Sequence, residues 1–332
     1  MQEDIDAILS TGVDVKLNTT IGTEELKQIQ QEYDAIYVAI GAHTDKKLGL
    51  EGEDSKNVIS AVDMLREIGD GAYPDYTGKR VVVVGGGNVA MDCARTAMRA
   101  NAETVSIVYR RRQEDMTALP AEVEGAIAEG IELVTLKAPL RVEADAEGNA
   151  CALWVQPQII GPVKGGRPSP RKANKPEERM ECDIVLVAIG QDIVSEPFAD
   201  FGMAVNRGRI AADKGGAANM VGVYAGGDCV SGPATVIKAI AAGKAAAANI
   251  DEYLGYHHPI SCDVEIPEPM LNDKVPCGRV NLQEVEAWAR KTNFEGIELP
   301  MSCEEAVQEA SRCLRCDRHG CGTLRGGREF EW

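Results

Sequence analysis

The sequence predicts an α/β protein built on parallel sheets, and three features of the 332-residue chain lead to this fold class. Four consecutive valines, residues 81–84, have the β-branched character of a strand buried on both faces. A turn of three glycines follows them, and then a helix whose small residues recur at spacings of three and four. Two strand-like segments, residues 33–41 and 182–190, both end in Ala-Ile-Gly, which indicates two related domains.

The turn after the valine run is typical of a segment that binds a dinucleotide. Gly85 permits the tight bend, Gly87 lets a pyrophosphate approach the backbone, and Ala90 allows the helix to pack closely on the strand. The first amides of the helix, which is expected over residues 91–100, then face the anion. Since the next strand, residues 104–109, follows in the required order, we expect a Rossmann-like dinucleotide-binding domain.

Three consecutive arginines follow that second strand, where a site specific for NAD usually carries an acid for the ribose hydroxyls. They are Arg110, Arg111 and Arg112. Guanidinium groups can hold a 2′-phosphate through paired hydrogen bonds, whereas a carboxylate there would repel it. The sequence therefore predicts binding of NADP rather than NAD. The alternative is a solvated basic loop after an ordinary glycine turn.

The ends of the two similar strands are expected to approach cofactors; they are Ile40-Gly41 and Ala188-Ile189-Gly190. A third landmark is Gly226-Gly227-Asp228, followed by Gly232-Pro233-Ala234-Thr235-Val236 and an alanine-rich helix. Asp228 is placed to accept a hydrogen bond from a sugar-like hydroxyl, and the amides near Thr235 to polarise a ring carbonyl. Alternatively, these are ordinary strand ends and a bare turn.

Taken in order, these motifs resemble the small (β) subunit of NADPH-dependent glutamate synthase and related flavin and pyridine-nucleotide oxidoreductases. The similarity runs from about Ile5 to Leu254. It implies that NADP(H) is held by the glycine turn, the two residues after it and the arginines: Gly85, Gly87, Asn88, Val89, Arg110, Arg111 and Arg112. It also implies that FAD faces Gly227, Asp228, Ala234, Thr235 and Val236, and that Gln191 lies where nicotinamide meets flavin.

In that family the flavin domain opens with its own strand, glycine turn and helix, and residues 1–32 do not supply them. Residues 4–17 instead predict a helix that leads through Gly12 into a short strand. We therefore expect an incomplete, discontinuous FAD domain that binds FAD weakly alone, so that the chain is a fragment or another chain completes the site. The expected domains are 1–65 (part of the FAD domain), 66–190 (NADP domain), 191–256 (rest of the FAD domain) and 257–332 (connector and cysteine-rich segment).

Residues 156–180 are rich in glycine, proline and basic side chains and predict an exposed loop of a hairpin. Its cations either meet an acidic partner or are solvated: Lys164, Arg167, Arg171, Lys172 and Lys175.

The C-terminal region gathers cysteines behind a predicted helix. Ser302 and Glu305 form a helix-capping signature, and the helix leads into Cys313, Cys316 and Cys321, whose spacing lets thiolates share one metal centre. The sequence Glu-Ala-Ser-Arg-Cys-Leu-Arg-Cys resembles the iron–sulfur segment of glutamate synthase small subunits, which implies a 4Fe-4S cluster. Its fourth ligand is taken as Cys303, with Cys277, Cys262 or another chain as alternatives. A zinc site that includes His319, or unligated surface cysteines, are the other interpretations.

Charge and composition exclude other classes. A formal charge of −17 opposes nucleic-acid binding, and no apolar run is long enough to span a bilayer. An acidic start is unlike a secretory signal, so we expect a cytoplasmic protein with reduced thiols. Cys93, Cys151 and Cys182 are expected in the core, and the histidines His43, His257 and His258 at the surface.

Together these features predict NADPH-linked electron transfer within a hetero-oligomer: hydride passes between nicotinamide and FAD, and electrons continue through an iron–sulfur centre to a partner protein. One alternative is a flavin-dependent NADPH dehydrogenase with a zinc tail. Another is a non-catalytic NADP-binding module left by loss of the first flavin motif. The final acceptor is not named by any residue of the sequence.

Overall fold

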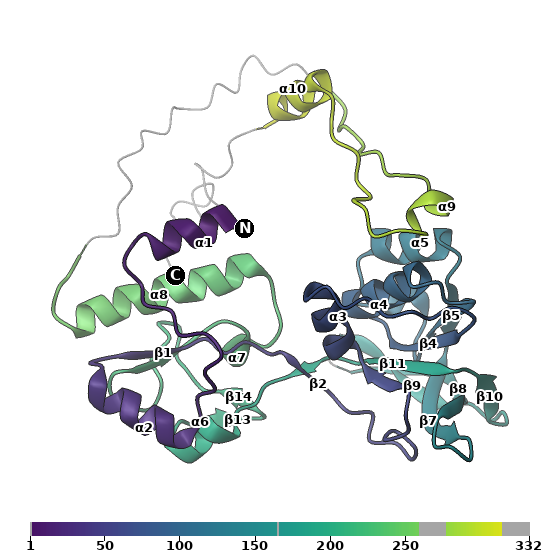
Figure 1. Cartoon of the computed structure of the whole chain (residues 1–332), viewed down its shortest axis with the longest axis horizontal. Helices are drawn as coiled ribbons and strands as arrows, with labels where there is room; N and C mark the ends of the chain where they lie inside the picture. The colour runs from purple at the N-terminus through teal and green to yellow at the C-terminus, as the bar shows by residue number, and fades with distance from the viewer. Residues whose placement is uncertain (1, 165, 259–276, 314–332) are drawn as a thin grey trace. The chain divides into compact units, whose positions relative to one another are not determined.

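The computed structural model describes residues 2–164, 166–258 and 277–313, which form two compact units. The first unit contains residues 2–42 and 193–258, and the second contains residues 43–192 and 277–313. Figure 1 shows both units, with labels on most of their helices and strands. Among the described residues, no helix combines the length and the apolar character that crossing a membrane requires.

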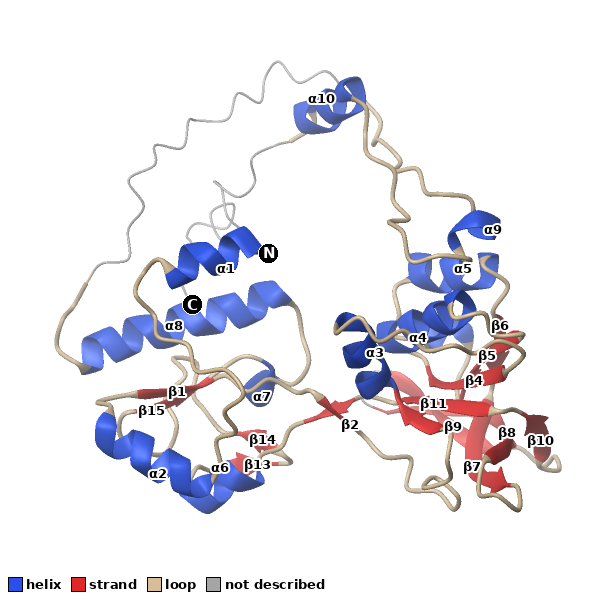
Figure 2. Cartoon of the chain, viewed as in Figure 1, coloured by secondary structure: helices blue, strands red, loops and turns tan. Residues whose placement is uncertain are grey.

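A five-stranded parallel sheet forms the centre of the second unit (Figure 2). Its order is β3–β11–β4–β5–β6, with bounds Val58–Ser60, Ile184–Ala188, Arg80–Gly85, Thr104–Tyr109 and Glu132–Thr135. The four valines of β4 are at most 3% exposed, so the prediction of a strand buried on both faces is confirmed. Parallel strands connected through helices confirm the predicted α/β class.

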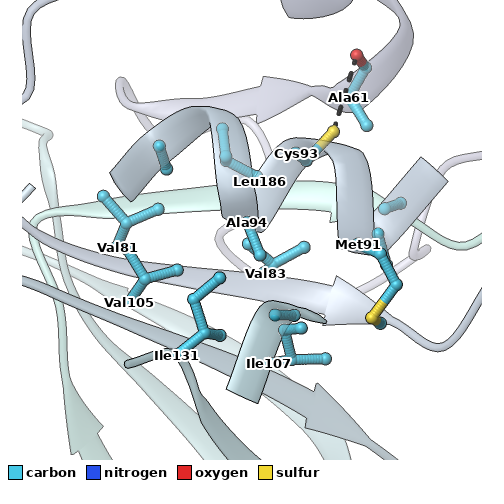
Figure 3. Close-up of a cluster of buried hydrophobic side chains, with 14 of the residues drawn as sticks. Ala61, Val81, Val83, Met91, Cys93, Ala94, Val105, Ile107, Ile131 and Leu186 are labelled. Atoms are coloured by element: carbon cyan, nitrogen blue, oxygen red, sulfur yellow. Dashed lines mark hydrogen bonds between the residues drawn. The ribbon is translucent and has the colours of Figure 1, made fainter. Parts of the chain in front are cut away.

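Three helices cover one face of this sheet: α3 (Ala61–Gly69), α4 (Asn88–Arg99) and α5 (Pro120–Ala128). Figure 3 shows α4 above the sheet, with Ala94 close to Val83 and Met91 beside the same core. The small residues of α4 that pack there are fully buried: Ala90, Cys93, Ala94 and Ala97. Small side chains let the helix lie close to the strands, and the predicted helix is confirmed with a start three residues earlier.

A sheet of antiparallel strands covers the other face of the parallel sheet. It contains β7 (Lys137–Ala144), β8 (Ala150–Lys164), β9 (Arg167–Lys172) and β10 (Glu178–Glu181). Leu153 and Val155 of β8 share a core with Val82 and Val84, because alternate residues of each strand point to opposite faces.

The prediction that residues 156–180 form an exposed loop is wrong. β8 and β9 pair across most of this segment, and Gln156 and Ala173 are buried. Two prolines, Pro168 and Pro170, are tolerated in β9 because, among the described residues, it pairs with β8 alone and so is an edge strand.

Two further strands of the second unit, β2 (Thr44–Asp45) and β12 (Gln191–Asp192), pair antiparallel. β3 and α3, which the predicted domain boundary at residue 65 places with the FAD domain, pack in this unit as well. The proposed division by cofactor stays a prediction.

The first unit holds a short parallel pair, β1 (Ile36–Val38) with β15 (Val223–Ala225), and a β13 (Val205–Asn206) to β14 (Arg209–Ile210) hairpin. Its helices are α1 (Gln2–Leu9), α2 (Thr23–Glu32), α6 (Glu196–Phe201), α7 (Asp228–Ser231) and α8 (Val236–Tyr253). Leu26 and Phe198 pack with Val38 and Val223 in its core.

Two sequence predictions in this unit are wrong. Residues 33–41 do not form a buried strand, since β1 spans three residues and only Val38 in it is buried. The strand expected after Gly12 does not form either, and Val13, Val15 and Leu17 are 53%, 56% and 79% exposed. Among the described residues, β1 pairs with β15 alone and residues 13–17 pair with no strand. An isolated pair of strands is marginally stable at best and leaves much of its apolar surface uncovered.

The C-terminal segment of the second unit contains α9 (Ala287–Arg290) and α10 (Cys303–Ser311). Arg290 Nε lies 2.9 Å from Glu129 Oε1, just after α5, and this contact ties the segment to the unit. The predicted cap of α10 is confirmed: Ser302 Oγ accepts from the Glu305 amide at 3.1 Å, and Glu305 Oε2 accepts from the Ser302 amide at 2.9 Å.

Buried thiols and exposed histidines follow the expectations with one difference. Cys93 and Cys182 are fully buried, and burial raises the pKa of each thiol to about 12, whereas Cys151 is only partly buried. His257 and His258 are exposed, and their Nδ1 atoms each lie 2.6 Å from a carboxylate.

Candidate functional site

Each glycine of the turn between β4 and α4 has different surroundings. A Cβ on Gly85 would lie 2.4 Å from Ala188 O, and one on Gly86 would lie 2.4 Å from the ring of Tyr109. At Gly87 the nearest atom would be Thr117 Oγ1 at 3.4 Å, an ordinary contact. The first two glycines therefore let strand ends pack together, while Gly87 leaves the backbone open to a ligand. Gly86 was not among the predicted site residues, and its role depends on a ring that only the fold brings near.

Asn88 and Val89 form the first turn of α4, whose amides have no partner within the helix. Such amides and the helix dipole favour a bound anion. The Asn88 side chain has another role, because its Oδ1 accepts from the Leu119 amide at 2.9 Å. The Thr117 amide also donates to Gly86 O at 2.9 Å. The loop before α5 thus holds the glycine turn in place, and the Asn88 side-chain oxygen is engaged by that loop.

The three arginines after β5 have three different environments. Arg110 is exposed and has no ion pair among the described residues. Arg111 Nε donates to Pro168 O at 2.7 Å. Arg112 makes two hydrogen bonds of 3.0 Å with Asp115, and these bonds lower the pKa of the Asp115 carboxyl. Arg110 and Arg111 are therefore better placed than Arg112 to meet a phosphate.

The β8–β9 hairpin adds a fourth cation that sequence reasoning did not assign to this site. Arg167 Nη2 lies 3.4 Å from Asp115 O, to which Tyr109 Oη also donates at 2.9 Å. Arg167 is thus beside the turn that carries the arginines. The only sequence signal was a basic residue after Gly166, and the pairing of β9 with β8 was needed to place it.

The end of β11 lies beside the glycine turn. Ala188 pairs with Gly85 in the parallel sheet, and Gly190 adopts a φ of 129°, which favours glycine. Gly190 O accepts from the Lys46 amide at 3.1 Å, and Gln191 is partly buried in β12. The structure therefore gathers the predicted residues of the second unit, Gly85, Ala188 and the arginine turn, at the carboxyl edge of one sheet, where open α/β sheets bind ligands.

In the first unit the Gly226-Gly227-Asp228 turn follows β15. A Cβ on Gly226 would lie 2.3 Å from Tyr37 Oη, whereas at Gly227, with a φ of 75°, the nearest atom would be 3.9 Å away. Asp228 Oδ1 accepts from the Ala234 amide at 3.1 Å. Cys229 is buried beneath the turn, and burial raises the pKa of its thiol. This favours the neutral thiol, the unreactive form.

A pocket of about 130 Å³ opens between this turn and the start of α8, lined by Gly226, Gly227, Lys238 and Ala242 among others. Ligand pockets typically measure about 300–1,000 Å³, so this one accommodates only part of a dinucleotide. Thr235 and Val236 begin α8 and are exposed, as is Ala234. Ile40 and Gly41 follow β1, and Gly41 has a φ of 68°. An acid, a helix N-terminus and a partial pocket fit one part of an FAD site.

The predicted metal ligands are only partly within the described residues. Cys303 is exposed at the first position of α10, and Cys313 is exposed just after its end. Cys316 and Cys321, and with them the zinc alternative through His319, lie outside the described residues. Among the residues that the structure describes, no group of three ligating side chains is assembled.

Known proteins resemble the chain in sequence. It is 37% identical over 341 residues to the NADP(+)-dependent formate dehydrogenase subunit beta of Moorella thermoacetica, covering 97% of this chain and 48% of that protein. It is 35% identical to the NADPH-Fe(3+) oxidoreductase subunit beta of Geobacter sulfurreducens, covering 96% and 53%. The glutamate synthase [NADPH] small chain of Escherichia coli is 33% identical over 73% of this chain and 55% of its own. The chain spans about half the length of these curated relatives.

Solved structures agree in fold. FprA from Mycobacterium tuberculosis in complex with NADPH matches with a TM-score of 0.57 at 20% identity, over 69% of this chain and 65% of FprA. Thioredoxin reductase from Lactococcus lactis matches with a TM-score of 0.51 at 21% identity, over 66% of each chain.

The resemblance to glutamate synthase small subunits inferred from the motifs is confirmed by these relatives. The family model described as pyridine nucleotide-disulphide oxidoreductase matches residues 1–243, and NADP and FAD are the cofactors that fit this family. On this match, and on a fold shared with FprA, the chain belongs to the pyridine nucleotide-disulphide oxidoreductase family.

Proposed function

We propose that this chain is the coenzyme-binding part of an NADPH-linked electron-transfer oxidoreductase that works with partner subunits in the cytoplasm. The observation that carries the proposal is the carboxyl edge of the parallel sheet. There an open helix N-terminus at Gly87 lies in the same unit as an arginine turn whose first member, Arg110, is exposed. A phosphorylated dinucleotide matches this arrangement of amides and guanidinium groups.

The residues at that edge have different roles in binding NADP(H). The α4 amides at Asn88 and Val89 hold the pyrophosphate, and Arg110 and Arg111 hold the 2′-phosphate. Ala188 ends β11, Gly190 and Gln191 follow it, and all three border the nicotinamide end. Hydrogen bonds to Asp115 hold the Arg112 side chain along the turn, so Arg112 stabilises the turn that carries Arg110 and Arg111.

The first unit contributes the flavin side. Asp228 receives a ribityl hydroxyl, and the α8 amides near Thr235 and Val236 face the flavin ring. Because the pocket beside Gly227 is small, we propose that FAD binds tightly only when a further strand, glycine turn and helix complete this unit.

When bound, nicotinamide and flavin supply hydride transfer, and an iron–sulfur centre at the C-terminal cysteines supplies single-electron transfer to the partner. Three relatives support the involvement of a partner, since each is named as a subunit or chain of a larger enzyme. The enzymes named for these relatives differ, so we propose that the partner sets the acceptor of this chain.

Purification of the full-length protein with its partner subunits tests the proposal. We expect bound flavin, bound iron, and dye reduction that is faster with NADPH than with NADH. Flavin with zinc in place of iron would favour a dehydrogenase that acts directly on a small molecule. A complex that binds NADP but contains neither flavin nor iron would refute electron transfer and leave a binding module.

A further inference from the structure

The start of α8 has little apolar packing. Three aliphatic side chains in its first two turns leave most of their surface uncovered, since Val236, Ile237 and Ile240 are 75%, 78% and 54% exposed. Thr235, at the N-cap, makes no side-chain hydrogen bond to the helix, so the first amides of α8 stay open to a ligand. The direction in which these amides point therefore depends on the chain that leads into the helix.

The chain that leads into α8 is tied to the glycine turn after β15. Asp228 Oδ1 accepts from the Ala234 amide at 3.1 Å, and Ser231 Oγ lies 3.2 Å from Gly227 O. Ser231 and Gly227 also line the pocket beside this turn. Hydrogen bonds thus connect the turn that carries Asp228, which we assign to a ribityl hydroxyl, with the loop before the helix amides.

Arg209 connects this loop to the β13–β14 hairpin. Its Nη1 atom donates to Ser231 O at 2.6 Å. The next residue of β14, Ile210, is 1% exposed and belongs to the core of the first unit, so the backbone that carries Arg209 is fixed by burial. The guanidinium group therefore links a well-packed strand to a loop that has little packing of its own.

The contact between Arg209 and the loop requires the glycine at position 232. A Cβ on Gly232 would lie 2.6 Å from Nη2 and 2.7 Å from Cζ of Arg209. The φ of Gly232 is 83°, in the left-handed region that favours glycine. Both the available space and the backbone angle thus let the guanidinium group lie directly against the loop that precedes α8.

We propose that Arg209 is a positioning residue of the flavin site, which holds the first amides of α8 toward the flavin ring through its contacts with Ser231 and Gly232. The inference rests on the proposed function for the identity of the ligand, and on the structure for the choice of residue. Reduction places negative charge on the flavin ring, and a correctly directed helix N-terminus stabilises that charge. Arg209 therefore favours the reduced flavin, and it acts through the helix.

The test compares Arg209→Ala with Arg207→Ala in the full-length protein, purified with its partner subunits. Arg207 is an exposed arginine of the same hairpin, so its substitution removes the same charge. We expect Arg209→Ala to bind FAD about tenfold more weakly, because a hydrogen bond from a charged group is lost. The reduction potential of the bound flavin, measured by redox titration of the visible spectrum, should shift to a more negative value. Arg207→Ala should match the unmodified protein in both measurements.

Arg209→Lys separates positioning from a general loss of stability. A lysine can still donate to Ser231 O, so this variant should restore most of the reduction potential, and NADPH binding in the second unit should be the same in all variants. A flavin potential in Arg209→Ala equal to that of the unmodified protein, or an equal shift in Arg207→Ala, would overturn this inference and leave the flavin assignment standing. An unmodified complex that contains no flavin would overturn both.

Discussion

Replacement of Glu129 by glutamine is expected to destabilise the second unit strongly. The Glu129 side chain is fully buried and accepts five hydrogen bonds of 2.8–3.1 Å from Arg95, Arg99 and Arg290. Burial alone would raise the pKa of this carboxyl, but the bonds from Arg95 and Arg99 outweigh burial and hold the pKa below its usual value. The carboxylate is therefore ionised and shared by three cations.

The expected loss of stability depends on which carboxylate partners the three arginines keep. Breaking a buried ion pair costs about 3–5 kcal/mol, because the other charge stays buried without a partner. Arg95 keeps Glu122 and Arg290 keeps Glu284, so only Arg99 loses its carboxylate outright. We therefore expect a value at the lower end of this range, a fall of about 3 kcal/mol in the free energy of unfolding.

Urea unfolding followed by tryptophan fluorescence measures this loss, since Trp154 and Trp288 both lie in the second unit. With an m-value of about 2 kcal/mol/M, the midpoint should fall by about 1.5 M. Glu124→Gln is the matched control, because Glu124 is exposed on α5, the helix that ends just before Glu129. A midpoint for Glu129→Gln equal to that of Glu124→Gln would refute the account of the buried network.

The same network predicts the effect of pH. A carboxyl with a lowered pKa in the folded state stabilises the protein above its unfolded pKa, about 4.3, and that stabilisation is lost as pH falls through the folded pKa. The difference in stability between the unmodified protein and Glu129→Gln should therefore be full at pH 7 and shrink below about pH 4. A difference that stays constant across this range would contradict the assignment of an ionised Glu129.

Two further substitutions address the coenzyme site. Gly86→Ala would place a Cβ 2.4 Å from the Tyr109 ring, so we expect a loss of about 1–3 kcal/mol in stability by overpacking and weaker NADPH binding by calorimetry. Gly243→Ala is the control, since Gly243 has open space around it within α8, where alanine is the better helix former. It should leave NADPH binding unchanged and cause no loss of stability. Arg167→Ala should raise the KM for NADPH about tenfold, since a hydrogen bond to a charged group contributes about 1.5–3 kcal/mol. The KM for NADH should change little. Lys172→Ala, at an exposed residue, is the control. Equal effects of Arg167→Ala on both coenzymes would show that Arg167 does not contact the 2′-phosphate.

Local patterns in the sequence were sufficient where one stretch of chain decides the structure. The valine run, the small residues of α4 and the Ser302 cap each act through neighbours in sequence, and all three appear as predicted. The glycine turn was recognised for the same reason.

Features that depend on distant partners were not predictable in this way. Residues 33–41 and 13–17 have the composition of strands, but whether they are buried depends on a neighbouring strand that their own sequence does not contain. The hairpin of β8 and β9 was hidden by prolines and glycines that an edge strand tolerates. Arg167 owes its role to a contact with Asp115, 52 positions away, and Gly86 owes its role to a ring brought over by the sheet.

The coenzyme preference of a double substitution, Arg110→Ala with Arg111→Ala, tests the central claim most directly. The measurement is kcat/KM for dye reduction with NADPH and with NADH, using the complete enzyme. Lys79→Ala, which removes an exposed cation just before β4 and so at the opposite end of that strand from the glycine turn, is the control. We expect the ratio of NADPH to NADH to fall about a hundredfold, because two guanidinium contacts to the 2′-phosphate are lost and each contributes about a factor of ten. A ratio unchanged from that of the unmodified protein would contradict the assignment of this sheet edge as an NADP site.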